Sequence, residues 1–402
     1  MDSTGAGWSA CSARACSGTT CVRATSARCC AAGPSSRPTW RSAGWRWWAM
    51  QPVPGCRGCA AVPRRIRDRV AVARAWLRGE TSTIPGPAVL AIETTVRCNL
   101  RCPMCPRTGA GYPAEDMPDA MLWRLLDEHA ALGGDLVWLN GLGEPFLDAR
   151  LFDVLARCRE LGLGTVVATN GTRLTAEHRR RLLEVGCDQL LVSIEGVTER
   201  TYRHHRPGGR LAEVEAAVRS LAAEKRAAGS RMVLAVQMVR MPRTIPEEDA
   251  FLARWRSVPG VDLVRLKDEE FGAEGYELAR SDAPLRHSPC RILWTGPLIV
   301  RWNGDVAACH PRAARRMHLG NLHEHSLLEL WTGPEARRLR RIHAERRAGE
   351  DPRCAECPVS RPRRPYVLAA MSVRAGTVQR AIPIAEHVSR RWGLPFLENR
   401  RG

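Results

Sequence analysis

Between residues 88 and 267 the sequence alternates strictly between short apolar segments and longer segments with helical periodicity. The apolar segments, rich in Val, Ile and Leu, are typical of buried β-strands. The predicted strands are 88–95, 135–141, 164–171, 188–196, 231–239 and 261–267, and the predicted helices are 119–132, 151–162, 175–186, 211–229 and 245–257. Alternation of this kind predicts an α/β fold in which helices cover a parallel sheet.

Six strands are too few to close an eight-stranded barrel, and the count fits a partial, open (β/α)6 barrel. In barrels of parallel strands, the functional residues lie at the carboxyl ends of the strands, in the loops that follow them. Motifs that directly follow the predicted strands are therefore the first candidates for a functional site.

Composition separates an N-terminal segment from the rest of the chain. Residues 1–80 hold 13 Arg and 3 acidic residues, seven of the 16 cysteines lie before residue 60, and no strand or helix period is evident before about Val62. We expect this segment to be low in order and not necessarily part of the true protein, with Met50 as one later start. A short amphipathic helix is predicted over Arg64–Leu77.

The net charge of +19 comes with a strong preference for Arg over Lys, since only Lys225 and Lys267 occur. This bias indicates GC-rich coding and solvated faces more than nucleic-acid binding, although a basic surface attracts polyanions. No apolar run is long enough to cross a bilayer, and the first residues lack the apolar stretch of a secretory signal. We therefore expect a cytoplasmic protein without a membrane or nucleic-acid partner.

Three cysteines with the spacing C-x3-C-x2-C follow the first predicted strand, namely Cys98, Cys102 and Cys105. In a cytosolic chain, patterned cysteines indicate metal or redox sites before disulfides. Three thiolates in one loop can bind three irons of a 4Fe-4S cluster and leave the fourth iron open to another ligand. A zinc site is the alternative, but zinc needs a fourth protein ligand, and the nearest downstream histidine is His129.

The segment CNLRCPMC resembles the signature of the radical S-adenosylmethionine (SAM) superfamily. Later loops resemble further elements of that family in the family's order: NGLGEP at 140–145 the GGE motif, ATNGTRLT at 168–175 the third-strand TNG element, SIEG at 193–196 the fourth-strand S-x-D/E element, and HRPGG at 205–209 the stretch that follows it. Leu142 departs from the GGE pattern, where a glycine usually stands. The resemblance covers about residues 88–270, and its elements occur in order, which argues against coincidence.

This resemblance implies a SAM-binding [4Fe-4S] cluster on the three cysteines and SAM contacts from Gly143, Glu144, Asn170 and Ser193. In the family, an electron passes to SAM, which splits to give a 5′-deoxyadenosyl radical that abstracts a hydrogen atom from the substrate. A low-potential electron donor of the flavodoxin or ferredoxin type is implied as a partner. The resemblance names no catalytic side chain beyond these residues.

A second set of cysteines lies in the C-terminal part: Cys290, Cys309, Cys354 and Cys357. The first two flank a predicted β-hairpin at 297–310, and the last two form a compact pair after helical stretches at 327–345. Spacing alone allows either zinc or a four-thiolate 4Fe-4S cluster.

The second set resembles the twitch domain, a shortened relative of the SPASM domains that follow radical SAM barrels. The resemblance implies one auxiliary [4Fe-4S] cluster in a small α+β, cysteine-rich domain. The expected organisation is a low-order segment at 1–80, a radical SAM core at 85–275, a twitch/SPASM-like domain at 285–362 and a tail at 363–402.

The combination resembles radical SAM dehydrogenases of the 2-deoxy-scyllo-inosamine dehydrogenase type. It implies an oxidoreductase that abstracts a hydrogen from a small polar, sugar- or aminocyclitol-like molecule and passes an electron to the auxiliary cluster. One alternative is a peptide- or protein-modifying radical SAM maturase, and another is a radical enzyme that modifies tRNA. An alternative of a different class is a zinc-stapled basic protein that binds nucleic acid.

Overall fold

The computed structural model of this 402-residue chain describes residues 61–108, 113–268, 288–309, 317–355, 357 and 364–372. All of them belong to one structural unit, Gly55–Gly402. The seven cysteines before residue 60, and residues 373–402, lie outside the described ranges.

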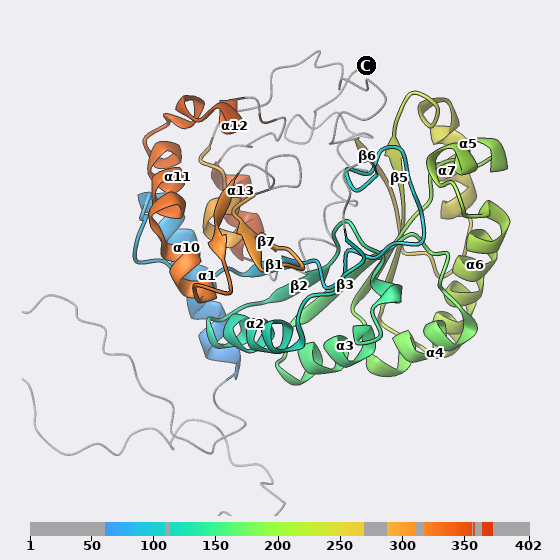
Figure 1. The fold of residues 1–402 in the computed structure, drawn as a ribbon, viewed down its shortest axis with the longest axis horizontal. Coiled ribbons are helices and arrows are strands. Elements are labelled where there is room, and N and C mark those ends of the chain that lie inside the picture. Colours follow the sequence, from blue (N-terminus) through green and yellow to red (C-terminus); the bar gives the residue numbers. More distant parts are fainter. Residues whose placement is uncertain are drawn as a thin grey trace, which may run out of the picture. The chain divides into compact units, whose positions relative to one another are not determined.

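A nine-stranded sheet organises the described residues, and its first six strands run parallel in the order β6-β5-β4-β3-β2-β1 (Figure 1). These strands are β1 (Val89–Ile92), β2 (Leu136–Leu139), β3 (Gly164–Thr169), β4 (Gln189–Ser193), β5 (Val233–Arg240) and β6 (Leu263–Asp268). Each pairs in parallel with its sequence neighbour. The predicted α/β class and the open, six-stranded partial barrel are confirmed.

Helices connect these strands and lie on the outer side of the curved sheet (Figure 1). The predicted ones are α2 (Asp119–Ala131), α3 (Leu151–Glu160), α4 (Ala176–Val185), α6 (Leu211–Ala227) and α7 (Glu248–Arg256). Helix α5 (Glu199–His205) and the 3-10 turn η1 (Pro145–Leu147) are additional, and the helix predicted at 245–257 begins with the 3-10 turn η2 (Ile245–Glu247). Local signals set the bounds of α4, because the Thr175 hydroxyl accepts the His178 N–H at its start and Gly186 adopts φ 82° at its end.

The main apolar core lies between the sheet and the outer helices. Leu90 of β1, Val137 of β2 and Val167 of β3 are fully buried there, and α2 contributes Leu122 and Leu125. Each fully buried aliphatic side chain of this kind stabilises the fold by about 1.5–3 kcal/mol relative to an exposed one. This packing holds the strand ends, and so the loops that follow them, in fixed positions.

The predicted hairpin at 297–310 is present, but it extends the barrel sheet instead of forming a separate one. Strand β7 (Leu298–Val300) pairs in parallel with β1 and antiparallel with β8 (Asp305–Ala307), and β9 (His318–Asn321) pairs with β8. Around this extension lie α8 (Ile292–Thr295), α10 (Leu327–Thr332), α11 (Pro334–Ala344), η4 (Ala348–Glu350) and α12 (Pro352–Ala355). The predicted helical stretch at 327–345 is interrupted at Gly333, as expected.

Two further helices, one before the barrel and one after the second cysteine set, pack beside this C-terminal region. Helix α1 (Ala61–Arg78) packs against α8 and against α13 (Arg364–Ser372). Its Ala75 and Trp76 are buried in a second apolar core. The predicted helix over Arg64–Leu77 is thus confirmed, and this part of the segment expected to be low in order belongs to the fold.

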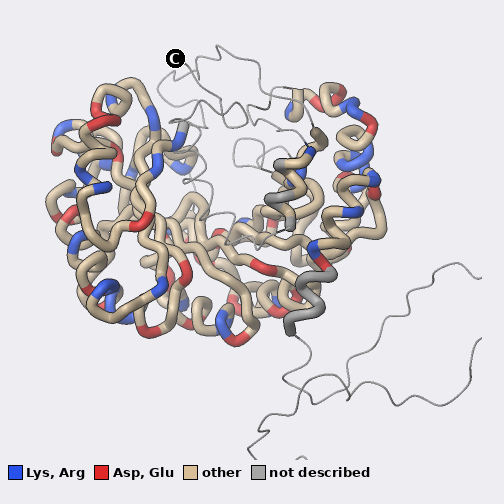
Figure 2. The backbone as a smooth tube through the Cα atoms, turned by 180° about the vertical axis from the view of Figure 1, so that it is seen from behind, with Lys and Arg blue, Asp and Glu red and all other residues tan. Residues whose placement is uncertain are grey.

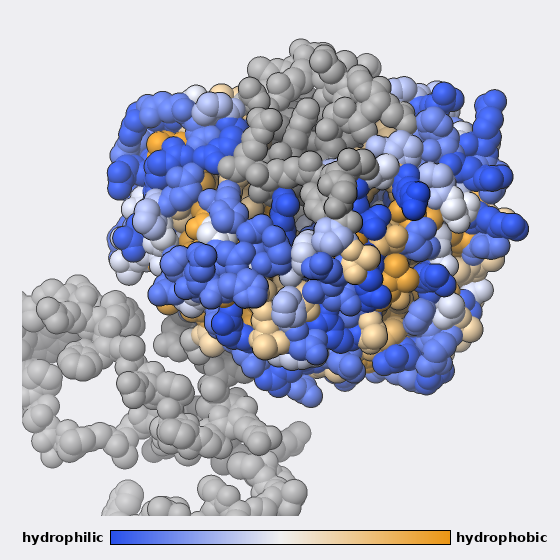
Figure 3. Space-filling view, in the orientation of Figure 1, coloured by the Kyte–Doolittle hydropathy of each residue, from blue (hydrophilic) through white to orange (hydrophobic). Residues whose placement is uncertain are grey.

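The described surface is mainly polar. Within the described ranges no helix is both long and apolar enough to span a bilayer. Basic and acidic residues are interspersed along the outer helices (Figure 2), and the face seen in Figure 3 is mostly hydrophilic with small apolar patches.

Candidate functional site

A cavity of about 220 Å³ lies at the carboxyl ends of the parallel strands. Every residue predicted for the first cluster and for SAM lines it: Cys98, Cys102 and Cys105 after β1, Gly143 and Glu144 after β2, Asn170 after β3, and Ser193 at the end of β4. Residues that are far apart in the sequence are therefore brought together by the order of the strands. This is the arrangement expected of a site in a barrel of parallel strands.

The three cysteines form one wall of the cavity. Cys102 is buried, Cys98 and Cys105 are half-buried, and all three are free thiols packed against Leu100 and Met104. The backbone N–H of Cys105 donates to the Cys102 carbonyl oxygen at 3.0 Å, which turns the loop back on itself. Thiolate sulfur is the ligand that iron–sulfur clusters use, so the donor set fits such a group.

Burial raises the pKa of two thiols of this wall, that of Cys102 to about 11 and that of Cys105 in the same direction. Because the thiolate is the form that ligates a metal, a bound metal must displace these protons.

Two side chains from outside this loop, one directly after β3 and one at the end of α5, donate hydrogen bonds to sulfur atoms of this wall. The Asn170 amide nitrogen lies 3.9 Å from Cys98 Sγ and 3.1 Å from the Asn99 side-chain oxygen. The Arg206 Nη1 lies 3.7 Å from Cys102 Sγ. Donors placed in this way stabilise negative charge on thiolate sulfur, and they fix the loop after β1 against the rest of the sheet.

Arg206 is held in place by the fully buried carboxylate of Glu195, with which it forms an ion pair. Burial lowers the pKa of Arg206, but the adjacent carboxylate outweighs that effect and holds the pKa well above its usual value. The guanidinium therefore stays charged beside Cys102. The motif at 205–209 contains this arginine, although its contact with a cysteine was not predicted.

Glu144 was predicted as a SAM contact, but its carboxylate is buried and accepts hydrogen bonds from within the protein. Its oxygens accept the Thr169 hydroxyl at 2.7 Å, the Asn170 backbone N–H at 2.8 Å and the Phe146 N–H at 3.2 Å. Its own N–H donates to the Arg97 carbonyl oxygen at 2.8 Å. The side chain therefore ties the loop after β2 to the end of β3, and the backbone N–H ties it to the loop after β1.

Gly143 stands where the loop after β2 crosses the loop after β1. A Cβ at this position would lie 2.1 Å from the Thr95 carbonyl oxygen, so no residue with a side chain fits there without a shift of backbone. Leu142, the departure from the family pattern, donates its N–H to the Glu93 carboxylate at 2.6 Å. Despite Leu142, the backbone of this loop still approaches the loop after β1 closely at Gly143.

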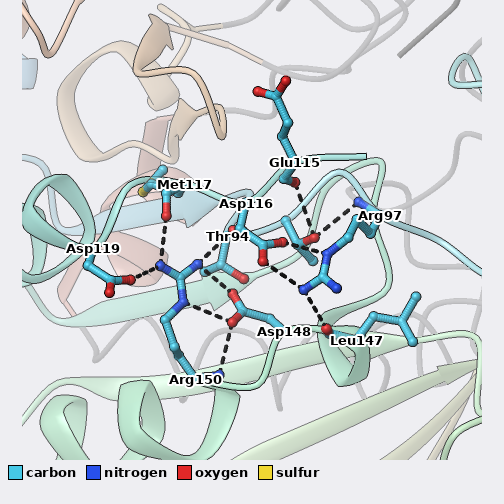
Figure 4. A network of polar contacts seen from close by, with 10 residues as sticks. Thr94, Arg97, Glu115, Asp116, Met117, Asp119, Leu147, Asp148 and Arg150 are labelled. Carbon is cyan, nitrogen blue, oxygen red and sulfur yellow. Dashed lines mark hydrogen bonds and ion pairs between the residues drawn. The ribbon is translucent and has the colours of Figure 1, made fainter. Parts of the chain in front are cut away.

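Two arginines anchor the loops beneath the cavity (Figure 4). Arg97, directly before the first cysteine, donates two hydrogen bonds to the Asp116 carboxylate, at 2.8 and 2.7 Å, and one to the Leu147 carbonyl oxygen at 2.7 Å. Arg150 donates to the Thr94 carbonyl oxygen at 3.2 Å. The start of the cysteine loop is therefore fixed to the turn after β2.

Sequence reasoning missed several polar residues of the cavity lining, among them Arg107, Thr108, Asn140 and Lys267. Lys267, near the end of β6, lines the cavity together with Ser193. It is one of only two lysines in the chain, and it stands at the end of the last predicted strand. The rarity of lysine and this position at a strand end are the two sequence features that could have identified Lys267 as a site residue.

Three members of the second cysteine set, Cys290, Cys309 and Cys354, lie in or against the second apolar core. Cys309 and Cys354 are buried, and Cys290 and Cys357 are partly exposed. Within the described ranges, no three His, Cys, Asp or Glu side chains converge as they do around a single metal ion. One histidine that was not predicted, His343 of α11, contacts this set, with Nε2 3.3 Å from Cys354 Sγ.

Two family models match the chain, and each covers one cysteine set. The radical SAM superfamily model matches residues 92–235, and the model of the iron-sulfur cluster-binding domain SPASM matches residues 290–358.

Two curated relatives match over three quarters or more of their own length, whereas others, such as the AdoMet-dependent heme synthase of Methanosarcina barkeri, match over about a third of theirs. The PqqA peptide cyclase of Xanthomonas campestris pv. campestris (strain 8004) is 31% identical over 305 residues, which cover 63% of this chain and 76% of that protein. The tungsten-containing aldehyde ferredoxin oxidoreductase cofactor-modifying protein of Pyrococcus furiosus is 24% identical over 292 residues, 60% of this chain and 80% of that one.

Among solved structures, that of Streptococcus suis SuiB bound to precursor peptide SuiA is similar, with a TM-score of 0.51 and 16% identity. The match covers 68% of this chain and 70% of SuiB. It supports the same overall fold.

Proposed function

Because this chain belongs to the radical SAM superfamily, among the members with a SPASM domain, we propose that it abstracts a hydrogen atom from a peptide substrate. The observation that carries the hydrogen abstraction is the cavity that the three cysteines of the C-x3-C-x2-C motif line together with Gly143 and Ser193. The family uses a SAM-binding 4Fe-4S cluster and auxiliary clusters as cofactors.

We assign the SAM-binding cluster to Cys98, Cys102 and Cys105. When bound, this cluster and SAM together supply a 5′-deoxyadenosyl radical that abstracts hydrogen from an unactivated C–H bond. The backbone beside Gly143 offers polar groups to the amino group of SAM, and the Ser193 hydroxyl lines the cavity from β4. Glu144 and Arg97 act as positioning residues, because they hold the loops on which these groups lie.

We assign one auxiliary cluster to Cys290, Cys309, Cys354 and Cys357. All four lie inside the SPASM match, and no cysteine follows Cys357 in the sequence. A cluster with four thiolate ligands supplies an electron acceptor, because it has no free iron for a substrate.

The proposal adopts the peptide-modifying alternative in preference to the small polar substrate that the resemblance to the dehydrogenases implied. The support is the PqqA peptide cyclase of X. campestris, which matches this chain along most of both proteins. The overall change we propose removes two hydrogens from the peptide. One leaves as the atom that completes 5′-deoxyadenosine, and the other leaves as a proton together with an electron. A donor of the flavodoxin or ferredoxin type provides the electron that SAM cleavage consumes.

The test is an anaerobic incubation of the reconstituted protein with SAM and dithionite. One arm contains a synthetic copy of a short peptide encoded beside the gene, and the other contains 2-deoxy-scyllo-inosamine. We expect the peptide to stimulate 5′-deoxyadenosine formation and to lose the mass of two hydrogens. Stimulation by the aminocyclitol and not by the peptide would restore the dehydrogenase interpretation.

A further inference from the structure

His343 lies between two segments that carry cysteines of the second set. It belongs to α11 and is 5% exposed. Its Nδ1 lies 3.4 Å from the backbone N–H of Cys290, and its Nε2 lies 3.3 Å from Cys354 Sγ. One imidazole therefore links the segment before α8 to the segment in α12.

The two contacts decide which ring nitrogen carries the proton. Nδ1 accepts a hydrogen bond from the Cys290 backbone, so its lone pair is in use and it holds no proton. An imidazole that accepts a hydrogen bond at Nδ1 carries its N–H at Nε2. The Nε2–H consequently points at Cys354 Sγ, and this nitrogen has no lone pair to offer to a metal.

We propose that His343 donates this Nε2–H hydrogen bond to the Cys354 thiolate of the auxiliary cluster and thereby raises the reduction potential of that cluster. A hydrogen bond to ligand sulfur stabilises the additional negative charge of the reduced state more than it stabilises the oxidised state. The inference rests on the auxiliary cluster assigned above and does not depend on whether the substrate is a peptide.

Contacts of helix α11 with α8 hold the His343 imidazole next to the Cys290 segment. Arg340, one turn before His343, is buried and donates to the Leu293 carbonyl oxygen of α8 at 2.7 Å. Its guanidinium lies 4.2 Å from the centre of the Trp331 ring. The first contact fixes α11 to α8, which begins two residues after Cys290, and the second fixes it to α10.

The same helix is also fixed to the Cys354 segment. Arg338 of α11 forms an ion pair with the buried carboxylate of Asp351. The Asp351 carbonyl oxygen accepts the backbone N–H of Cys354 at 2.9 Å. Because both cysteine segments are tied to α11 independently of the imidazole, replacing His343 should remove the hydrogen bond and keep the surrounding fold.

The test is a redox titration of the auxiliary cluster in full-length protein that also carries Cys98→Ala, Cys102→Ala and Cys105→Ala, so that only this cluster contributes. His343→Leu removes the donor, and His343→Gln keeps an N–H near the position of Nε2. His318→Leu is the matched control, because His318 lies in the same region but has an exposed side chain paired with Asp305. Iron per chain is measured on every sample.

We expect His343→Leu to shift the equilibrium about tenfold toward the oxidised cluster, a midpoint about 59 mV lower for a one-electron couple. His343→Gln should recover part of this shift, and the control should match the parent. Equal midpoints in the parent and His343→Leu, at equal iron content, would overturn the proposal. Loss of iron from both His343 variants would also overturn it, because that result identifies the histidine as a ligand. A parent without iron would refute the auxiliary cluster itself.

Discussion

The two cysteine sets differ in where their members lie in the fold. The first set comes from one loop, Cys98–Cys105, at the edge of a cavity. The second comes from separate segments between Cys290 and Cys357, and three of its four members lie in an apolar core lined by Trp76 and Trp294. None of the second set lines the cavity.

This difference corresponds to two kinds of chemistry. A loop with three sulfurs beside a cavity leaves room for an exchangeable ligand, whereas four thiolates on one cluster leave no iron free. The polar partners differ as well, since a charged guanidinium, Arg206, contacts Cys102 and a neutral imidazole, His343, contacts Cys354. We therefore expect substitutions in the two sets to have separable effects.

The largest effect should come from removing the sulfurs. Replacing Cys98, Cys102 and Cys105 by Ala should abolish 5′-deoxyadenosine formation, because no site for SAM cleavage remains. Replacing Cys354 and Cys357 by Ala should keep 5′-deoxyadenosine formation and stop oxidation of the substrate. Chromatography of the nucleoside and mass spectrometry of the substrate measure the two outcomes.

Cys158→Ala is the control for these variants, because Cys158 is buried in the main core and away from both sets. It should keep both activities. Full substrate turnover by the Cys354/Cys357 variant would contradict the electron-acceptor role.

A second prediction concerns the ion pair beside the first set. Arg206→Leu leaves the fully buried Glu195 carboxylate without its partner, so it should lower the free energy of unfolding by about 3–5 kcal/mol. Arg210→Leu is the matched control, because the Arg210–Glu213 pair is exposed and contributes little. Urea denaturation of the two variants measures the difference.

Equal urea midpoints for Arg206→Leu and Arg210→Leu would contradict the claim that the buried Arg206–Glu195 pair stabilises the site. The double variant Arg206→Leu/Glu195→Gln should recover part of the lost stability, because it removes the uncompensated charge.

A third prediction concerns the crossing of the loops after β1 and β2. Gly143→Ala places a Cβ 2.1 Å from the Thr95 carbonyl oxygen, so it should cost about 1–3 kcal/mol and weaken SAM binding about tenfold. Gly349→Ala meets no atom within 4 Å and should change neither quantity. Equilibrium binding of SAM to the reconstituted proteins is the measurement, and equal affinity in both variants would contradict the packing argument.

The smallest effect should come from the amide that contacts Cys98. Its nitrogen lies 3.9 Å from the sulfur, a longer and weaker hydrogen bond than the 3.3 Å contact of His343. Asn170→Ala should therefore lower the midpoint potential of the first cluster by about 30 mV or less, roughly a threefold change in its equilibrium. A shift larger than that of His343→Leu on the auxiliary cluster would reverse the ranking of the two contacts.

The barrel strands and the first cysteine set could be predicted because both leave local patterns. An apolar run such as Gln189–Ser193 falls within the strand predicted at 188–196. The spacing of Cys98, Cys102 and Cys105 also lies within one loop, so no knowledge of the fold was needed to group them.

Features that depend on long-range packing left no such pattern. The pairing of β7 with β1, which joins the C-terminal hairpin to the barrel sheet, is a backbone contact between distant segments. His343 reaches Cys354 only because α11 is fixed to both α8 and α12. Glu144 was found by its motif, but its carboxylate turns inward because Thr169 and Asn170 offer donors that the sequence does not place.

Iron counted per chain after anaerobic reconstitution tests most directly the claim that this chain holds one open and one closed 4Fe-4S site. The account predicts about eight irons in the wild-type protein and about four in each of two variants, one lacking Cys98, Cys102 and Cys105 and one lacking Cys290, Cys309, Cys354 and Cys357. Equal iron in the wild type and either variant would contradict it.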